Sequence, residues 1–320
     1  MLTILPAAAA TVDRVSVFAS GAAVNATAPD AITIANETLW VSYANGADST
    51  GLKGSSTVVE YSFNGSVLKK YSIPGSVDGL KFNPETNVIW VLQNQDGNST
   101  LTLISPEKGI LPGSPFSYAV KSSTRGYDDV AFLNGRAYMS YTNPTSPEDD
   151  TIQVLDKGTS PLQLDSVLEK DVTGTNLTTE MRNQATSQND PDSLSTTPFD
   201  GLMLSSGDDG QLIFVQHPRT SAQSVSFLQL IDTTGTAVSG LDDAVWVLTP
   251  KGTFFISDTK NNRVLKVEAS NLSPVSLYAS VGSLNVVGNV DLETGVVTPF
   301  ITSVNGPHGM VFVSDFKSLF

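Results

Sequence analysis

Residues 76–91 read SVDGLKFNPETNVIWV, in which an aspartate and a small residue precede a short apolar run, a turn and a second apolar run with a tryptophan. The same order recurs along the chain, so this stretch is one copy of an internal repeat. Successive copies are spaced by 48, 50, 64, 50 and 66 residues, a period near 50 with two insertions. Each copy places a polar key residue before its first apolar run. The key residues are Asp30, Asp78, Asp128, Asp192, Asp242 and His308.

Each repeat is typical of four short antiparallel β-strands. The first strand follows the key residue, and an aromatic-rich second strand comes next, as in TLWVSYANG after Asp30 and TFFISDTKNN after Asp242. A third strand, such as TVVEYSFNG or RVLKVEAS, and a more variable fourth strand complete the unit. With almost no helical periodicity, this pattern predicts an all-β fold, a β-propeller with four antiparallel strands per blade. A β-sandwich with coincidental spacing is the alternative.

The number of key residues predicts six blades. Residues 273–306 contain more strand than one blade edge needs, so a seven-bladed ring stays open. We expect the N-terminal DRVSVFAS to share a blade with the C-terminal MVFVSDF, because propellers usually close with strands from both ends. Residues 12–320 are then one domain. Its one long polar insertion, about residues 165–190, leads to the fourth key residue, where it is either a lid over the mouth or a solvated loop.

The amino-acid composition and net charge limit the ligands and macromolecules that the protein can bind. The chain has 320 residues, no cysteine, two histidines and a net charge of -14. These values exclude thiolate chemistry and a multi-histidine zinc cage, and they disfavour nucleic acid as a partner. No apolar run reaches the roughly 18 residues that a membrane span needs. We therefore expect a monomer that binds a cation or a small-molecule ligand.

The N-terminus, MLTILPAAAATVDR, has an apolar run followed by small residues. Residues 1–11 are predicted to be the remnant of a secretion signal or a disordered start, and an ordinary first strand is the alternative. The chain also contains Asn-x-Ser/Thr sequons, which are compatible with export. The predicted location is secreted or periplasmic. The sequons are at Asn25, Asn36, Asn64, Asn98, Asn176 and Asn271.

The stretch GTFFISDTKNNRVLKV resembles an NHL repeat, and the chain from about residue 12 to 316 is similar to the NHL-like and SMP-30/gluconolactonase-like propellers. That group includes lactonases, lyases and non-catalytic binding proteins. In its lactonase-like members the ligands at the channel mouth are a mixture of Glu, Asn and Asp. The resemblance implies that Asp30, Asp128, Asp192 and Asp242 take the corresponding places here. This chain differs in having no Glu in the first motif and no Asn at any key position.

In a propeller the key residues and the loops between second and third strands share one face, which is therefore acidic. Two carboxylates about 7 Å apart repel by roughly 2 kcal/mol at an effective dielectric near 20. A divalent cation with oxygen ligands, best Ca²⁺, would neutralise the ring. Protonation or turn-capping hydrogen bonds would do so without a metal. The predicted metal ligands are Asp30, Asp78, Asp128, Asp192 and Asp242.

Three functions are compatible with this face. The first is a metal-dependent hydrolase of a lactone or ester-like small molecule, in which His308 and Asp242 are catalytic. The second is a non-catalytic propeller that binds a small ligand, a glycan or a protein, and the third is a structural protein. The sequence leaves open whether the protein is an enzyme. The second-strand aromatic residues, with Trp40 and Trp90 at equivalent places, are predicted to lie in the blade core, as are Tyr138 and Phe255.

Overall fold

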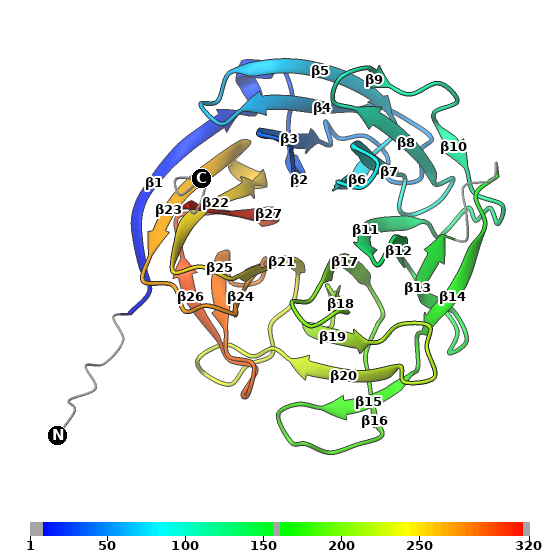
Figure 1. The fold of residues 1–320 in the computed structure, drawn as a ribbon, viewed down its shortest axis with the longest axis vertical. Helices are drawn as coiled ribbons and strands as arrows, with labels where there is room; N and C mark the ends of the chain where they lie inside the picture. Colours follow the sequence, from blue (N-terminus) through cyan, green and yellow to red (C-terminus); the bar gives the residue numbers. More distant parts are fainter. Residues whose placement is uncertain (1–8, 156–160, 316–320) are drawn as a thin grey trace.

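The computed structural model describes residues 9–155 and 161–315. Within these ranges the chain forms 27 β-strands and two short 3-10 helices, η1 (Gly21–Val24) and η2 (Thr259–Asn261). The strands make six sheets that are arranged radially around one axis (Figure 1). The predicted all-β, six-bladed propeller is confirmed, and the seven-bladed alternative is not the one formed. No helix in the described ranges is long and apolar enough to cross a membrane.

The six innermost strands each begin one residue before a key residue. Their side chains alternate between the two neighbouring blade interfaces, which explains the apolar run after each key residue. The opening stretch therefore starts an inner strand, as the repeat predicts. The inner strands are β2 (Pro29–Ala35), β6 (Val77–Asn83), β11 (Tyr127–Leu133), β17 (Pro191–Thr196), β21 (Leu241–Val247) and β27 (Pro307–Ser314).

Blades one and three are simple four-stranded antiparallel meanders. In each of them the strands follow one another outward in chain order. The outer strands of blade one are β3 (Thr38–Tyr43), β4 (Ser55–Ser62) and β5 (Val67–Pro74). Those of blade three are β12 (Arg136–Tyr141), β13 (Asp150–Leu155) and β14 (Leu164–Glu169).

Blades two and four carry extra or shortened outer strands. Blade two contains β7 (Val88–Gln93), β8 (Thr100–Ser105), β9 (Gly109–Ile110) and β10 (Phe116–Ser117). Blade four contains β18 (Gly201–Ser206), β19 (Gln211–Gln216), β20 (Ser224–Gln229), β15 (Thr173–Asn176) and β16 (Gln184–Ala185). β15 pairs in parallel with β20, so β15 and β16 of the insertion lie at the outer edge of blade four and not across the mouth (Figure 1). The start of the insertion forms β14 of blade three, and its last residue, Asp190, reaches the mouth pocket.

Blades five and six do not follow the predicted strand order. TFFISDTKNN and RVLKVEAS form β22 (Lys251–Asp258) and β23 (Arg263–Ser270), which lie in blade six between β27 and β1 (Thr11–Ser20). The prediction that they follow β21 within its own blade is wrong. Blade five is instead completed by three strands from the region with excess strand. These are β24 (Ser276–Val281), β25 (Val286–Val290) and β26 (Val297–Ile301).

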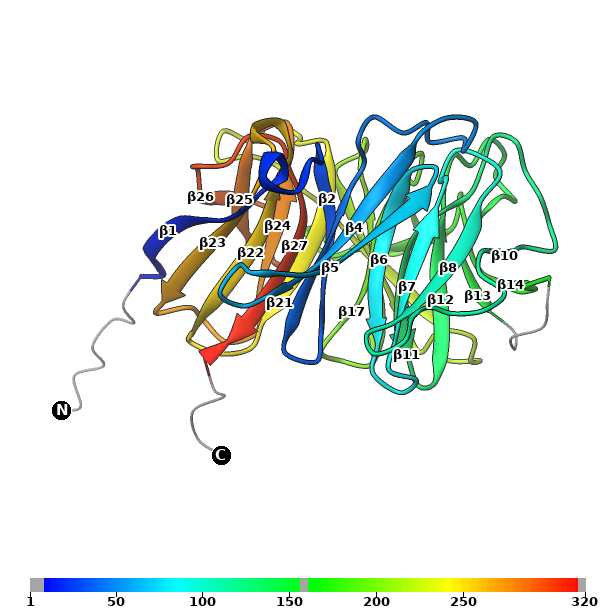
Figure 2. The ribbon, with the colours of Figure 1, turned by 90° about the horizontal axis from the view of Figure 1, so that it is seen from above.

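The physical reason lies in how the ring closes. The two chain ends supply only the outermost strand, β1, and the innermost strand, β27, of blade six (Figure 2). The two middle strands must come from inside the chain, which crosses from β21 to β22 at the face away from the mouth and returns before β24. The predicted sharing of one blade by both ends is thus confirmed.

The apolar core consists of separate clusters between neighbouring blades. One cluster, for example, packs Trp40 of blade one against Ile89 of blade two, and both are fully buried. Another packs Phe254 of blade six against Tyr278 of blade five. These interfaces fix the blades around the axis and leave the axis itself to polar residues.

Candidate functional site

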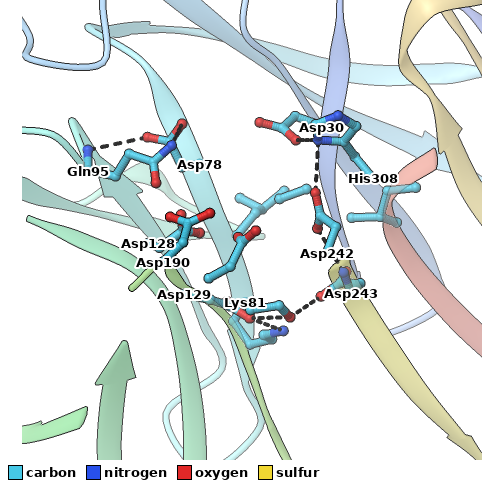
Figure 3. A pocket seen from close by; sticks show the side chains of 15 residues that line it. Asp30, Asp78, Lys81, Gln95, Asp128, Asp129, Asp190, Asp242, Asp243 and His308 are labelled. Atoms are coloured by element: carbon cyan, nitrogen blue, oxygen red, sulfur yellow. Dashed lines mark hydrogen bonds and ion pairs between the residues drawn. The ribbon is translucent and has the colours of Figure 1, made fainter. Parts of the chain in front are cut away.

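All six key residues line one pocket at the axis, with a volume of about 150 Å³ (Figure 3). The structure therefore brings together every site residue that the sequence predicts. Six further polar residues, which the repeat does not predict, line the same pocket. They are Lys81, Gln95, Asp129, Asp190, Ser193 and Asp243.

A β-bulge at each key residue explains why a polar residue precedes the buried strand. In blade one, Pro29 pairs with Tyr43 and Ile32 pairs with Val41, so Asp30 and its neighbour together face the single residue Ser42. The same register shift occurs at the start of the other five inner strands. A bulge re-aims side chains at the end of a strand, and here it directs the key residues into the pocket.

The residue after the key residue is small where a neighbouring blade approaches closely. A Cβ atom on Gly79 would lie 2.1 Å from the carbonyl oxygen of Asp128 in the next blade. A Cβ atom on Gly309 would lie 2.4 Å from the carbonyl oxygen of Asp30. These two glycines thus allow the inner strands to pack around the mouth.

His308 joins the two aspartates on either side of it. Its Nδ1 lies 2.8 Å from Asp242 Oδ2 and 3.2 Å from Asp30 Oδ1 (Figure 3). Although burial disfavours the charged imidazole, Asp242 and then Asp30 raise the pKa of His308 to about 11. His308 is therefore an imidazolium at neutral pH, and its Nε2–H has no acceptor among the described residues.

The opposite side of the pocket holds carboxylates without a cation. Asp128 is 8% exposed, and neither it nor Asp192 has a hydrogen bond or an ion pair with any described residue. Burial, and then the charge of Asp78, raises the pKa of Asp128, while burial and then Asp128 raise the pKa of Asp192. Burial, and then Asp30, raises the pKa of Asp78 to about 7. This side of the pocket is short of positive charge.

A second set of polar residues, next to the key residues along the inner strands, lines the same pocket. Lys81 Nζ lies 2.9 Å from Asp129 Oδ2, and the same carboxylate accepts a hydrogen bond from the Leu194 backbone N–H at 3.1 Å. Ser193 donates to Asp243 at 2.6 Å. Asp129 and Asp243 directly follow key residues, so the doubled aspartates in YDDV and LDDA were the signal that could have revealed this set.

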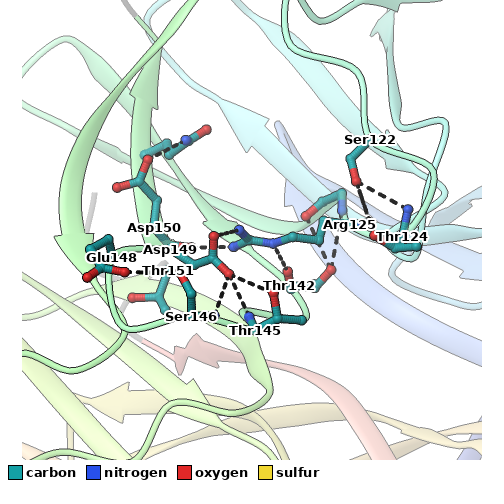
Figure 4. A network of polar contacts seen from close by, with 12 residues as sticks. Ser122, Thr124, Arg125, Thr142, Thr145, Ser146, Glu148, Asp149, Asp150 and Thr151 are labelled. Atoms are coloured by element: carbon teal, nitrogen blue, oxygen red, sulfur yellow. Dashed lines mark hydrogen bonds and ion pairs between the residues drawn. The ribbon is translucent and has the colours of Figure 1, made fainter.

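One aspartate in an acidic loop of the mouth face is paired with an arginine (Figure 4). Arg125 Nη1 lies 3.0 Å from Asp149 Oδ1, and its guanidinium stacks 4.0 Å from the ring centre of Tyr141. Backbone hydrogen bonds from Ser146, with smaller help from Arg125, lower the pKa of Asp149. Among the described residues only Asp149 of this loop has a cationic partner, so Glu148 and Asp150 still add to the acidic face, as predicted.

The donor set of the pocket fits a hard divalent cation. Among the described residues, Asp30, Asp242 and His308 are the group of three whose ligand atoms lie within 4.8 Å of one another. His308, however, is already held as a cation by both carboxylates, and a protonated imidazole does not bind metal. Asp128 and Asp192 belong to no such group of three, but their unpaired carboxylate oxygens are the kind of ligand that hard cations such as Ca²⁺ prefer.

The remaining predicted residues separate into core and surface. Trp40, Tyr138 and Phe255 are buried, as predicted, whereas Trp90 is half-buried and lines a different cavity. His217 follows β19 at the end away from the mouth, so it does not meet His308. The aromatic residues thus contribute nothing to the mouth pocket.

Comparison with known proteins finds similarity in fold. No family model and no curated protein sequence matches the chain. The periplasmic gluconolactonase of Pseudomonas aeruginosa has a similar structure, with a TM-score of 0.51 and 14% identity over 89% of this chain and 88% of that one. A Bacteroides caccae protein of unknown function has a TM-score of 0.52 and 9% identity over 89% and 86%. The chain thus has the propeller architecture implied by the gluconolactonase-like resemblance.

Proposed function

We propose that the protein is a divalent-cation-dependent hydrolase that opens a small lactone or ester-like molecule at the mouth pocket. The observation that carries the proposal is a protonated His308 that lies in one small pocket with the unpaired carboxylates of buried Asp128 and half-buried Asp192. The similarity in fold to a gluconolactonase supports this choice of reaction class. Ca²⁺ is the proposed metal.

Different residues of the pocket would hold the cation and keep His308 protonated. Asp128 and Asp192, with Asp78 beside them, would hold the cation. A bound divalent cation would polarise the carbonyl group and favour attack by water. Asp30 and Asp242 keep His308 oriented and protonated through Nδ1.

The proton steps follow from these positions. Water attacks the lactone carbonyl carbon, and a nearby ionised aspartate takes the proton that the water loses. The bond between that carbon and the ring oxygen then breaks, and His308 Nε2–H gives its proton to the leaving oxygen. The product is the open hydroxy acid. Asp78, which lines the same pocket, is the proposed base.

Metal analysis is the first test. We expect about one equivalent of calcium to co-purify with the wild type, and we expect EDTA to lower its melting temperature. The double variant Asp128→Asn, Asp192→Asn should bind no calcium, whereas Asp200→Asn, an exposed carboxylate on the opposite face, should behave as the wild type. A calcium-free protein that is indifferent to EDTA would overturn the metal site.

A second candidate function is supported by the small size of the pocket, whose volume is about 150 Å³. Such a site suits a non-catalytic propeller that binds a small ligand at the same face. A panel of aldonolactones and simple esters separates the two functions: turnover that is lost in His308→Gln supports the hydrolase, and binding without turnover supports the second candidate.

We also propose that the protein is exported and monomeric. Five of the six sequon asparagines are exposed, and Asn176 is half-buried, so export is compatible with the folded surface. Fractionation of the source cells and light scattering of the purified chain test the two statements. Recovery from the cytoplasm, or a dimeric mass, would contradict them.

A further inference from the structure

Trp40 and Trp90 occupy the same place in neighbouring blades but have different surroundings. Each is the third residue of the second strand, in β3 and β7. Trp40 is fully buried, and its Nε1–H donates to Thr38 Oγ1 at 2.9 Å. The position equivalent to Thr38 in β7 is Val88, whose side chain has no hydrogen-bond acceptor. The indole N–H of Trp90 is therefore without a partner among the described residues.

The ring that covers Trp40 is also missing at Trp90. Tyr71 stacks on Trp40 with ring centres 5.8 Å apart and planes inclined by 14°. Trp90 instead meets Phe132 edge-on, at 5.2 Å and 79°, and no described aromatic ring stacks on its face. Blade two cannot supply a second Tyr71, because its outer strands β9 and β10 are two residues long.

A cavity of about 390 Å³ lies beside Trp90, within the range of small-molecule sites, roughly 300–1,000 Å³. It lies between blades two and three at the ends of β6 and β11, on the face away from the mouth. Its apolar walls come from Trp90, Phe132, Val154 and Leu155. The cavity thus offers a flat aromatic surface and an unused hydrogen-bond donor.

Two arginines line the same cavity in a chain whose net charge is -14. Arg136 is exposed and has no ion pair or hydrogen bond with any described residue through its side chain. Arg219 Nη1 lies 2.8 Å from Asp165 Oδ2, which neutralises it. Glu85 also lines the cavity but forms no ion pair with Arg136, whose guanidinium is therefore unpaired among the described residues. A guanidinium pairs best with a planar carboxylate or a similar oxyanion.

We propose that this cavity binds a small aromatic carboxylate. Its ring stacks on Trp90, as Tyr71 does on Trp40, and its carboxylate pairs with Arg136. The site is independent of the mouth pocket and of any activity there.

Indole ¹⁵N–¹H spectra of the full chain test the proposal, because the protein has three tryptophans and each gives one signal. Trp90→Phe assigns the signal of Trp90. Titration with 2-naphthoate should shift this signal saturably and leave those of Trp40 and Trp246 in place. The neutral analogue 2-naphthalenemethanol should bind at least about tenfold more weakly, since it cannot form the charge-assisted pair with Arg136.

Matched variants make the test specific. Arg136→Gln should weaken 2-naphthoate binding by about tenfold, and Arg14→Gln, which removes an exposed arginine of β1, should have no effect. The mouth variant Asp128→Asn, Asp192→Asn should bind as the wild type does, so failure of the proposed hydrolase would not affect this result. Equal affinity for the acid and the alcohol, or no shift of the Trp90 signal at millimolar 2-naphthoate, would overturn the proposal.

Discussion

His308 and Asp242 come from different blades, yet His308 Nδ1 lies 2.8 Å from Asp242 Oδ2. The contact bridges blades five and six at the point where the chain finally closes the ring. It also sets the charge of the only histidine among the residues lining the mouth pocket. The pKa of His308 therefore reports whether this contact between blades five and six is formed.

Asp242→Asn should lower the pKa of His308 from about 11, because Asp242 is the largest favourable influence on the imidazolium. The shift is read from the ¹H–¹³C signal of the His308 ring during a pH titration in EDTA. His217 gives the internal control in the same spectra. A His308 titration that is the same in both proteins would contradict the ion pair.

His308 should also make stability depend on pH in alkaline solution. Since its folded-state pKa is raised from 6.5 to about 11, its stabilising effect is complete below about pH 6.5 and is lost as pH rises toward 11. In EDTA, wild-type unfolding free energy should therefore decline over this window more steeply than that of His308→Gln. Parallel curves from urea unfolding would rule out this contribution.

The mouth carboxylates should destabilise the metal-free protein as pH rises. The folded-state pKa of Asp78 is about 7, well above its ordinary 3.8, so the folded state loses stability between these values. Asp78→Asn should raise the melting temperature in EDTA at pH 8 by on the order of a few degrees, and by less at pH 4. An equal effect at both pH values would show that charge is not the cause.

Lys81→Met should be strongly destabilising, because it leaves the carboxylate of Asp129, which is 8% exposed, buried without its cation. The expected loss is about 3 kcal/mol in urea unfolding. The exposed pair of Lys251 and Asp315 is the control, and Lys251→Met should cost less than about 1 kcal/mol. Adding Asp129→Leu to Lys81→Met should restore part of the loss, and a purely additive double variant would contradict the coupling.

Gly79→Ala should destabilise the protein and displace the residues of the mouth pocket, although it adds only one methyl group. Its Cβ would lie 2.1 Å from the Asp128 carbonyl oxygen, so the inner strands of blades two and three must move apart. The expected cost is about 1–3 kcal/mol, with weaker calcium binding, measured by unfolding and calorimetry. Ala31→Gly, at the equivalent place in blade one, should leave calcium binding nearly unchanged.

The sequence was informative where the repeat is local. Asp78 and the apolar run after it predict both an inner strand and a residue at the mouth, because the bulge and the strand lie within a few neighbouring residues. The sequence led to a wrong prediction at β22. The pattern TFFISDTKNN is correct for a second strand, but it does not indicate which inner strand this strand pairs with. That choice depends on where the chain ends meet, which is a property of the whole ring.

The second set of polar residues in the pocket was missed for a different reason. Lys81 lies three residues after a key aspartate, in a run that reads as ordinary strand. Its role depends on Asp129 in the next blade, and a register between two blades cannot be read from either one alone. The cavity at Trp90 could not be predicted for the same reason. Trp40 and Trp90 have equivalent places in the repeat, and they differ in that Tyr71 covers Trp40 and no described ring covers Trp90.

The crossing at β22 and β23 also limits how this ring can change in evolution. Blades one to four are each built from one continuous stretch of chain, so duplicating or deleting one of these stretches adds or removes a self-contained sheet. The same event at the fifth repeat would copy or remove two strands of the closing blade together with four of its neighbour. Blades five and six are therefore inherited as one unit, and any gain or loss of blades must occur in the first four.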